Sequence, residues 1–398
     1  MNILMIHQHY YPEMSGTARR TKELAENFVK KGHQVSVLTS YPRKFRSLPG
    51  ISFKPHEQIN NVSVYRIKTL FEVNNIVLLR LFSYSTFVIQ SVLYALILSK
   101  KSEIVITIAP LSSGIIGALV KIINKKYHHF DVPDILPDLG ISAGMIKNKF
   151  VIKLLFRLEK WVYNNSDTIS TCTKGQLENI NNKGISIKKI TWISDWIDNS
   201  NFFSNDRILS TKLSKNFKGK KIISFIGNIG ALQNPEVFVD AMRLLSSENQ
   251  IQFLFIGDGI MLPDLKVKVE KLNIKNIEFI GRVKREQIPT YMSVSDILVA
   301  NYVPDKHLNL YIPGKLFEYA ISRRPIIMGG KGDSETFINK YKLGIVVPPS
   351  NANAFKKAIL KIINESYSFD PKIAQFMKDY SIENVTKKYD LIFRKLKP

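Results

Sequence analysis

Residues 302–330 read YVPDKHLNLYIPGKLFEYAISRRPIIMGG, and they predict the elements of an α/β domain. The tripeptide Pro-Gly-Lys at residues 313–315 indicates a loop, residues 316–321 have helical spacing, and residues 326–328 form a β-like run. Glu318 falls in the first turn of this helix. We therefore expect a loop, a helix and a strand in direct succession, with a carboxylate near the start of the helix.

Two interpretations of Glu318 and its neighbour Lys315 follow from this position. A carboxylate and a lysine beside free backbone N–H groups suit a ligand that carries both hydroxyl and phosphate groups. Alternatively, Glu318 only complements the helix dipole and Lys315 is a solvated loop charge. The local pattern leaves both interpretations open.

The composition indicates two α/β domains in a reducing compartment. The chain has 398 residues, of which 45% are hydrophobic, and this is enough for two cores. Its single cysteine, Cys172, excludes an intramolecular disulfide and a cysteine-based zinc site, and we expect it to be a small buried residue. The formal net charge of +24 is compatible with nucleic acid, anionic lipid or phosphorylated substrates as partners.

Residues 76–98 form the most apolar stretch and approach the length of a membrane span. Arg80, Gln90 and several hydroxyl side chains argue against a full span. Two interpretations remain: a helix packed on the first domain's sheet, or a helix of which one face, flanked by Lys100 and Lys101, lies in the membrane interface. Because the N-terminal segment lacks the basic region of a signal peptide, we expect a cytoplasmic protein.

The first half of the chain opens with a strand, a helix and a second strand, at residues 2–7, 17–31 and 34–39. This order is typical of a Rossmann-like βαβ unit. A later strand at residues 127–132 is followed by the loop that carries Asp134. Loops after the strands of a parallel sheet are where such folds bind ligands, although turn chemistry alone also explains an aspartate beside a proline.

The second half of the chain repeats this pattern. A strand at residues 221–226 runs into the glycine loop 227–230, and a helix is expected at residues 235–246. Glycine permits close approach of a ligand and the helix N–H groups face it, so this segment predicts an anion site. Two further strands, at residues 251–256 and 277–280, end in Gly-Asp-Gly and Gly-Arg-Val.

These segments resemble motifs of glycosyltransferase family 4, in the branch that builds bacterial surface polysaccharides. Residues 313–319 are similar to its Pro-Ser-Lys-Leu-x-Glu-Tyr segment, residues 227–233 to Gly-Asn-x-Gly-x-x-Gln, and residues 134–137 to Asp-Leu-Trp-Pro. The resemblance spans nearly the whole chain and implies the α/β fold called GT-B, in which two Rossmann-like parallel-sheet domains face each other across a cleft. It implies an acceptor-binding domain at residues 1–190, a nucleotide-sugar donor-binding domain at 191–375, and a C-terminal helix at 376–398 that returns to the first domain.

The resemblance further implies a retaining transfer of a sugar, without a metal or other cofactor, from a UDP-linked donor to a polyprenyl diphosphate-linked acceptor. The product would belong to an O-antigen or capsule, and the enzyme would work at the anionic inner face of the plasma membrane. The catalytic residues that carry over are Asp134, Lys315 and Glu318. The donor-binding residues that carry over are Gly16, Gly227, Asn228, Gly230, Gln233, Asp258, Arg282, Val283, Pro313, Gly314 and Leu316.

The chain departs from the family on the acceptor and sugar sides of the implied site. Pro133 replaces the histidine that many members carry before the aspartate, so the role of that histidine is absent or supplied elsewhere, for example by His129. Leu310 replaces a glutamate that contacts the sugar in many members. These two departures leave the identity of the transferred sugar open.

A third departure concerns the donor diphosphate. Asn228 and Gln233 stand where other members of the family carry an arginine and a lysine. A diphosphate needs cationic donors even when backbone N–H groups contribute. We hypothesise that Lys315 and Arg282 supply this charge.

Two other functions are compatible with the same residues. A nucleotide-sugar epimerase or hydrolase on this fold would consume the donor without making a glycosylated lipid. A basic membrane-binding module that has lost its chemistry would explain the three departures. We find no nucleic-acid-binding motif, and the basic residues are not interleaved with aromatic residues, so nucleic acid is not an expected partner.

Overall fold

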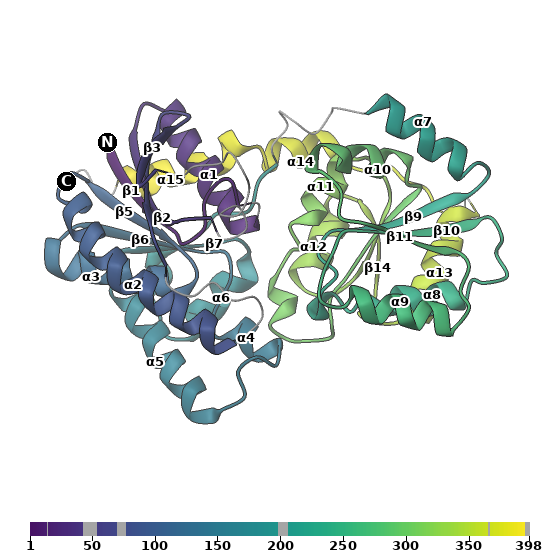
Figure 1. Cartoon of the computed structure of the whole chain (residues 1–398), viewed down its shortest axis with the longest axis horizontal. Coiled ribbons are helices and arrows are strands. Elements are labelled where there is room, and N and C mark those ends of the chain that lie inside the picture. The colour runs from purple at the N-terminus through teal and green to yellow at the C-terminus, as the bar shows by residue number, and fades with distance from the viewer. Residues whose placement is uncertain (14, 43–53, 70–76, 198–205, 365–366, 395–398) are drawn as a thin grey trace. The chain divides into compact units, whose positions relative to one another are not determined.

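The computed structural model describes residues 1–13, 15–42, 54–69, 77–197, 206–364 and 367–394, without the side chains of residues 77–84 and 214 (Figure 1). The chain divides into two compact units. The first comprises Met1–Asp195 together with Val385–Pro398, and the second comprises Trp196–Asn384. Each unit is described by itself below.

The first unit is built on a sheet whose described strands run in the order β3-β4-β2-β1-β5-β6-β7-β8. All neighbouring strands are parallel except β3 and β4. The strands are β1 (Asn2–Ile6), β2 (Gln34–Ser40), β3 (His56–Ile59), β4 (Val62–Ile67), β5 (Ile104–Ile108), β6 (Tyr127–Val132), β7 (Thr168–Thr171) and β8 (Ile190–Trp192). A parallel sheet needs helical crossovers, and these cover both of its faces.

The helices of the first unit form two layers (Figure 1). They are α1 (Gly16–Lys30), α2 (Val77–Ser99), α3 (Leu111–Asn124), α4 (Asp138–Ser142), α5 (Lys149–Asn164), α6 (Lys174–Asn182) and α15 (Ile382–Arg394). Phe87 of α2 and Ile116 of α3 pack with Leu4 of β1 in one core. On α1, Phe28 contacts Tyr389 of α15, with ring centroids 5.4 Å apart. The last helix of the chain is therefore part of the first unit's packing.

The second unit contains a parallel sheet whose described strands run in the order β11-β10-β9-β12-β13-β14. The strands are β9 (Lys221–Ile226), β10 (Ile251–Ile256), β11 (Ile277–Gly281), β12 (Ile297–Asn301), β13 (Ile326–Gly329) and β14 (Gly344–Val347). The helices are α7 (Arg207–Asn216), α8 (Glu236–Arg243), α9 (Leu262–Lys271), α10 (Ile288–Val294), α11 (Lys315–Ile321), α12 (Asp333–Lys340), α13 (Ala352–Ile363) and α14 (Ile373–Asp379). Alternate residues of β9 face two separate cores, Ile222 one and Ile223 the other.

The predicted fold class is confirmed: both units are α/β, with mostly parallel sheets of the GT-B type. The strands predicted at residues 127–132, 221–226 and 251–256 have the observed bounds. The helix expected at residues 376–398 is interrupted. Helix α14 ends at Asp379, Ser381 pairs with Ile197, and α15 begins at Ile382. The units divide after residues 195 and 384, whereas the sequence predicted boundaries after residues 190 and 375.

The apolar segment predicted at residues 76–98 forms α2, although Ile76 and the side chain of Arg80 lie outside the described residues. Phe87 and Ala95 are fully buried against the sheet. The other face of α2 exposes its large aliphatic side chains, including Ile89 at 67%. In the part of the chain that the structure describes, no helix is long and apolar enough to cross a membrane.

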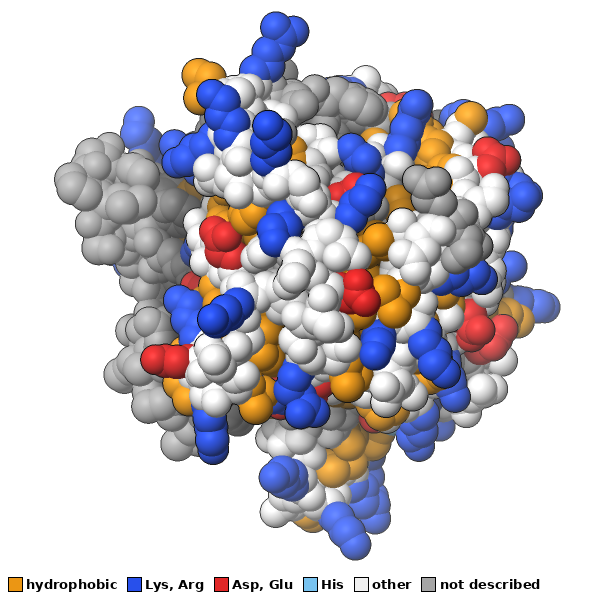
Figure 2. All heavy atoms as spheres, turned by 90° about the vertical axis from the view of Figure 1, so that its right-hand side faces the viewer, with side chains coloured by type: hydrophobic (Ala, Val, Ile, Leu, Met, Phe, Trp, Pro, Cys, Tyr) orange, Lys and Arg blue, Asp and Glu red, His pale blue; other side chains and the backbone are white. Residues whose placement is uncertain are grey.

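The face shown in Figure 2 carries many basic side chains, but they do not form one contiguous patch. On that face, Lys and Arg side chains are scattered, and acidic and hydrophobic side chains lie between them (Figure 2). A contiguous basic stripe is the usual footprint of a nucleic-acid-binding surface. This face does not have that character.

Candidate functional site

Three neighbouring strands of the second unit end in glycines whose backbone has a positive φ. The φ angles are +127° at Gly227 after β9, +138° at Gly257 after β10 and +78° at Gly281 at the end of β11. A Cβ atom on Gly257 would lie 1.9 Å from the carbonyl oxygen of Gly227. Both the angle and the contact require glycine there, so the three strand ends pack as close backbone layers.

Hydrogen bonds hold these layers together. The Gly227 N–H donates to the carbonyl of Ile256, and the Gly257 N–H donates to the carbonyl of Gly281, each at 2.8 Å. The Ile229 N–H donates to the carbonyl of Asp258 at 2.9 Å. The carboxyl edge of the sheet is thus a rigid backbone surface with few side chains in the way of a ligand.

The loop after β9 brings two amide side chains to one glycine. A Cβ atom on Gly230 would lie 2.6 Å from Asn228 Nδ2 and 3.0 Å from Gln233 Oε1. Asn228 is exposed, and the carbonyl of Gln233 accepts a hydrogen bond of 2.9 Å from Asn301 Nδ2 at the end of β12. Asn301 was not predicted; its position at a strand end was the signal that could have identified it.

Helix α11 reaches the same strand end through Tyr319. The Tyr319 hydroxyl accepts from the Ile226 N–H at 2.9 Å and donates to the Ile226 carbonyl at 3.1 Å. Lys315, one turn earlier, places Nζ 3.6 Å from the centroid of the Phe225 ring. A Cβ atom on Gly227 would lie 3.2 Å from that Nζ. The two most specific sequence motifs therefore meet at the carboxyl end of β9.

The Lys315 ammonium is buried, and within the described residues it has no hydrogen-bond partner. Desolvation by burial lowers the pKa of Lys315 to about 7, although the charge of Glu318 opposes this shift. A cation over an aromatic ring is stabilised by the quadrupole of the Phe225 ring, which offsets part of the desolvation. A buried cation without a hydrogen-bond acceptor remains costly, and an anionic ligand would remove that cost.

Glu318 forms an ion pair with a residue that the sequence did not single out. Arg285 Nη2 lies 3.0 Å from Glu318 Oε1, and the two side chains are 41% and 18% exposed. Arg285 belongs to a short 3-10 helix that follows β11. An ion pair this exposed contributes about 0 to 1 kcal/mol, so a ligand can displace it at little cost.

The other donor-binding residues predicted around β10 and β11 have different surroundings. Asp258 is exposed, and its Oδ1 accepts a hydrogen bond of 2.8 Å from the Gly259 N–H, as in a turn. Arg282 is exposed immediately after β11. Val283 is half-buried and packs against the core beneath α11. These residues lie along the same edge of the sheet as the glycine loops.

The residues around the start of α11 divide into buried and accessible ones. Pro313 is buried, and its carbonyl accepts the Leu316 N–H at 2.9 Å. Leu316 is fully buried in the core, so its side chain is unavailable to a ligand. Gly314 is exposed and precedes the helix. The accessible part of this motif is therefore Gly314 and the half-buried Glu318, whereas the Lys315 ammonium is buried.

Two predicted residues, Gly16 and Asp134, belong to the first unit. Gly16 is exposed at the start of α1, where Ser15 Oγ accepts the Ala18 N–H at 3.2 Å. Asp134 is exposed after β6, yet the surrounding protein desolvates its carboxyl group and, with the charge of Asp195, raises its pKa to about 6. A carboxyl group with this pKa is suited to orient or deprotonate a hydroxyl near neutral pH.

His129 is not available for the role of the histidine that many family members carry at the position of Pro133. Its Nδ1 lies 2.9 Å from Thr168 Oγ1, and its Nε2 lies 3.0 Å from Ser170 Oγ. The residue is fully buried, and desolvation lowers its pKa to about 4. His129 is therefore a satisfied core residue, and the hypothesis that it supplies the missing role is wrong.

Beneath the Asp134 loop lies a charged network that sequence reasoning missed. Arg20 of α1 is 3% exposed; its Nε lies 2.7 Å from Asp131 Oδ2 and its Nη1 lies 2.8 Å from Asp195 Oδ1. Ser170 Oγ donates to Asp131 Oδ1 at 2.6 Å. Cys172, expected to be a small buried residue, is 8% exposed and its Sγ lies 3.9 Å from Asp195 Oδ1. This network fixes the strand ends below Asp134.

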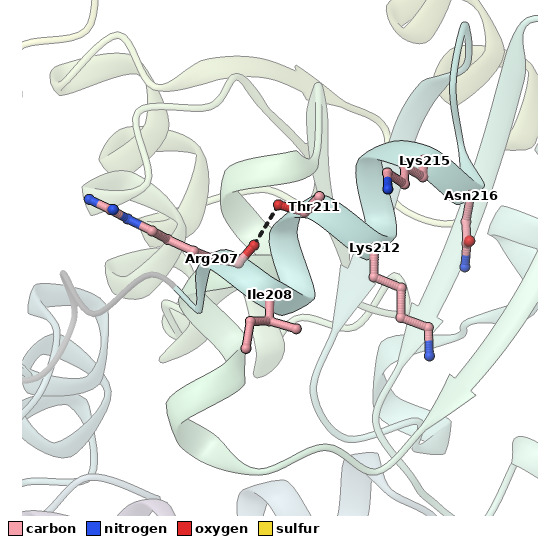
Figure 3. A pocket seen from close by; sticks show the side chains of 6 residues that line it. All are labelled: Arg207, Ile208, Thr211, Lys212, Lys215 and Asn216. Atoms are coloured by element: carbon pink, nitrogen blue, oxygen red, sulfur yellow. Dashed lines mark hydrogen bonds between the residues drawn. The ribbon is translucent and has the colours of Figure 1, made fainter.

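Within the described residues, neither a metal cluster nor the pocket of Figure 3 adds to the site. In the described ranges, no group of three or more His, Cys, Asp or Glu side chains could hold a metal ion. The pocket in Figure 3 is open and is lined by residues of α7 alone: Arg207, Ile208, Thr211, Lys212, Lys215 and Asn216. None of these is a predicted site residue.

Two family models match the chain. Residues 15–196 match the Glycosyl transferase 4-like domain, and residues 220–365 match Glycosyl transferases group 1. Together the two models cover most of the chain; the first match ends next to the boundary between the two units, and the second lies wholly within the second unit.

Curated relatives are also glycosyltransferases, and a solved structure shares the fold. The probable glycosyltransferase WbjE of Pseudomonas aeruginosa is 23% identical over 58% of this chain and 58% of its own length, which is less than two thirds. The putative colanic acid biosynthesis glycosyl transferase WcaI of Escherichia coli is 23% identical over 74% of this chain and 75% of its own length. The crystal structure of Anabaena HepE in complex with UDP is 12% identical, covers 99% of this chain and 100% of its own, and superimposes with a TM-score of 0.75.

Proposed function

This chain belongs to glycosyltransferase family 4, and from that premise we propose that it transfers a sugar from a UDP-linked donor to a lipid-linked acceptor, with retention at the anomeric carbon. The product is a bacterial surface polysaccharide, such as an O-antigen or capsule. Two similar proteins support this proposal: HepE was solved with UDP and with UDP-glucose, and WcaI is a putative glycosyl transferase of colanic acid biosynthesis.

The observation that carries the proposal is the buried ammonium of Lys315 beside Gly227. A cation that lacks a hydrogen-bond acceptor within the described residues, next to a glycine surface, suits the oxygens of a diphosphate. Lys315 also supplies the positive charge that an arginine and a lysine supply in other members of the family, at the positions where this chain has Asn228 and Gln233. The donor diphosphate therefore binds at the carboxyl end of β9, in contact with Lys315.

The reaction breaks the bond between the anomeric carbon and the diphosphate oxygen and forms a bond from that carbon to the acceptor oxygen, and the proton of the acceptor hydroxyl passes to the departing diphosphate. Negative charge grows on the departing diphosphate, where Lys315 and the backbone N–H groups near Gly227 and Gly230 stabilise it. The transfer needs no metal, because these groups carry the charge stabilisation.

We assign two carboxylates to the two ends of the substrates. Glu318 holds the ribose hydroxyls of the donor, for which it exchanges its ion pair with Arg285. Asp134 orients the acceptor hydroxyl, and its pKa of about 6 keeps it mostly ionised at neutral pH. A lipid-linked acceptor places the reaction on an anionic membrane, at the cytoplasmic face of the plasma membrane.

Calorimetric titration with UDP, GDP and ADP tests the donor site. We expect UDP to bind, and Lys315→Met to weaken binding about tenfold or more, because a charge-assisted contact is lost. Lys306→Met is the matched control: it removes an exposed lysine from the same segment and should leave the affinity unchanged. Failure of all three nucleotides to bind, or equal effects of the two variants, would overturn the proposal.

A further inference from the structure

The exposed large hydrophobic side chains of the first unit gather on one helix layer. Most of those in the described residues lie on α2, α3 and α5. Among them, Phe150, Leu154 and Trp161 of α5 are 76%, 55% and 36% exposed. Single exposed hydrophobics are ordinary, but a contiguous row of large ones marks an interaction surface.

On α5 this row runs beside a row of cations. Phe150, Leu154 and Trp161 are spaced by four and seven residues, so they share one stripe of the helix. A second stripe consists of four exposed basic residues with similar spacing: Lys149, Lys153, Arg157 and Lys160. The outward surface of α5 is therefore half apolar and half cationic.

The opposite face of α5 is packed into the first unit. Val162 and Tyr163 belong to the core beneath the helix. Glu159, the one carboxylate in α5, is 1% exposed and its Oε1 lies 2.7 Å from Lys183 Nζ. No carboxylate of the helix thus remains on the outward face to balance the four cations.

We propose that this face of α5 docks on an anionic lipid bilayer, with the apolar stripe in the boundary between headgroups and acyl chains and the cations at the lipid phosphates. This inference rests on the proposed function, because it names the surface that brings the enzyme to its lipid-linked acceptor. A helix with Lys and Arg on one side and Trp, Phe and Leu on the other lies flat in the membrane interface. Its cations add electrostatic attraction to an anionic leaflet.

Charge complementarity favours lipid over a second copy of this chain. A two-fold symmetric contact through α5 would place each cationic stripe near the stripe of the partner, with no acidic residue on either surface. Helix α2 also exposes an apolar row, which includes Ile89, Leu93 and Ile97. Residues 85–99 contain no charged residue, however, and the nearest described cations, Lys100 and Lys101, follow the end of α2, so no cationic stripe runs along the helix beside this row.

Co-sedimentation of the full chain with vesicles tests the proposal. Phosphatidylcholine vesicles with and without phosphatidylglycerol serve as the probe. We expect binding only with phosphatidylglycerol, and about tenfold weaker partitioning both for Phe150→Ser/Leu154→Ser and for Lys149→Gln/Lys153→Gln. The matched control, Leu93→Ser/Ile97→Ser in α2, should partition within about twofold of the wild type.

Brominated lipids give an independent reading. Of the three tryptophans, Trp161 lies on the proposed surface, while Trp196 is 3% exposed. Bromines near the headgroup end of the acyl chains should quench the fluorescence of the wild type and leave that of Trp161→Phe unchanged. Quenching that persists in Trp161→Phe would place another surface against the lipid and overturn the proposal.

Nucleotide affinity separates this inference from the proposed function. The α5 variants should bind UDP as the wild type does, which also shows that they are folded. Vesicle binding that is equal in the α5 variants and the wild type would overturn the docking surface and leave the donor site intact. Self-association that the α5 variants abolish would instead identify a second copy as the occupant. Failure of the wild type itself to bind UDP would count against the proposed function.

Discussion

The carboxyl edges of the two sheets each hold a buried cation, but the two cations differ in their partners. At the first edge, Arg20 forms ion pairs with both Asp131 and Asp195. At the second, Lys315 lies against Gly227 and has no hydrogen-bond acceptor in the described part of the chain. Burial and position are similar, so the presence or absence of a carboxylate partner distinguishes a structural cation from one that awaits an anion.

The pKa values of the two cations express the same difference. Burial alone would lower the pKa of Arg20, but Asp131 and the other acidic neighbours raise it well above its ordinary value. Burial lowers the pKa of Lys315 to about 7, and Glu318 offsets only part of this shift. The protein stabilises the charge of the first cation itself and leaves the second to a ligand.

The largest expected effect is a loss of stability at the first edge, where Arg20 is paired with carboxylates. Arg20→Met leaves Asp131 buried without its counter-charge, so the free energy of unfolding should fall by about 3 to 5 kcal/mol. Urea denaturation measures this change. Arg19→Met is the control from the same helix; its contact with Glu23 is partly exposed, and the loss should stay below about 1 kcal/mol.

The pH dependence of the Arg20→Met deficit checks its cause. Burial by itself would raise the pKa of Asp131, and Arg20 lowers it below its ordinary value. The stability that this ion pair contributes is present above the unfolded-state pKa of the aspartate and is lost as the pH falls through the lower folded-state pKa. The deficit of the variant should therefore shrink in acid; a deficit that is constant with pH would indicate lost packing instead.

The second prediction compares glycines at the two edges. Gly257→Ala places a methyl group 1.9 Å from the Gly227 carbonyl at a φ of +138°, and should cost about 2 to 4 kcal/mol of stability. Gly16→Ala meets no atom within 4 Å at the start of α1, and should leave stability unchanged or raise it by up to about 1 kcal/mol. Thermal denaturation of both variants decides; equal losses would contradict the close packing at the second edge.

The sequence was sufficient to predict the fold wherever a strand is followed by a strong breaker. The strand 221–226 ends at Gly227, and the strand 127–132 ends before Pro133, so both were predicted with correct bounds. The hairpin of β3 and β4 was not predicted, because its strands are short and partly polar. Local hydrophobic patterns do not predict a hairpin of this kind at the edge of a sheet.

The candidate site was predictable only where one segment carries the chemistry. Lys315 and Glu318 share a motif; Lys315 lies beside Gly227 at the end of β9, and Glu318 pairs with Arg285 after β11. Arg285, Phe225 and Tyr319 join that site through tertiary contacts between segments up to 93 residues apart. No local pattern encodes these contacts, so they required the structure.

The third prediction uses the pKa of Lys315. Below pH 7 the free protein carries mostly the ammonium form, which a diphosphate prefers, and above pH 7 mostly the neutral amine. The Kd for UDP-glucose should therefore be flat below pH 7 and rise above it, by up to about tenfold per pH unit. UDP-glucose is the ligand because its diphosphate is a diester and does not titrate in this range.

Calorimetry across this pH range, with two variants, tests the assignment. Lys315→Arg keeps its charge at every pH and should show a flat profile at high affinity. Lys315→Met should show a flat profile at low affinity. A wild-type profile without a break near pH 7 would mean that Lys315 already has an anionic partner, and the contrast between the two edges would disappear.

The smallest effect is expected at the exposed ion pair of the second edge. Arg285→Ala removes this ion pair and should change the free energy of unfolding by less than about 1 kcal/mol, because both partners reach solvent. The affinity for UDP should rise slightly, by less than about fivefold, since the ribose no longer competes with Arg285 for the carboxylate. Urea denaturation and calorimetry measure the two effects. If Arg285→Ala instead weakened UDP binding about tenfold, Arg285 itself would hold the diphosphate, and the second edge would carry two ligand-binding cations rather than one.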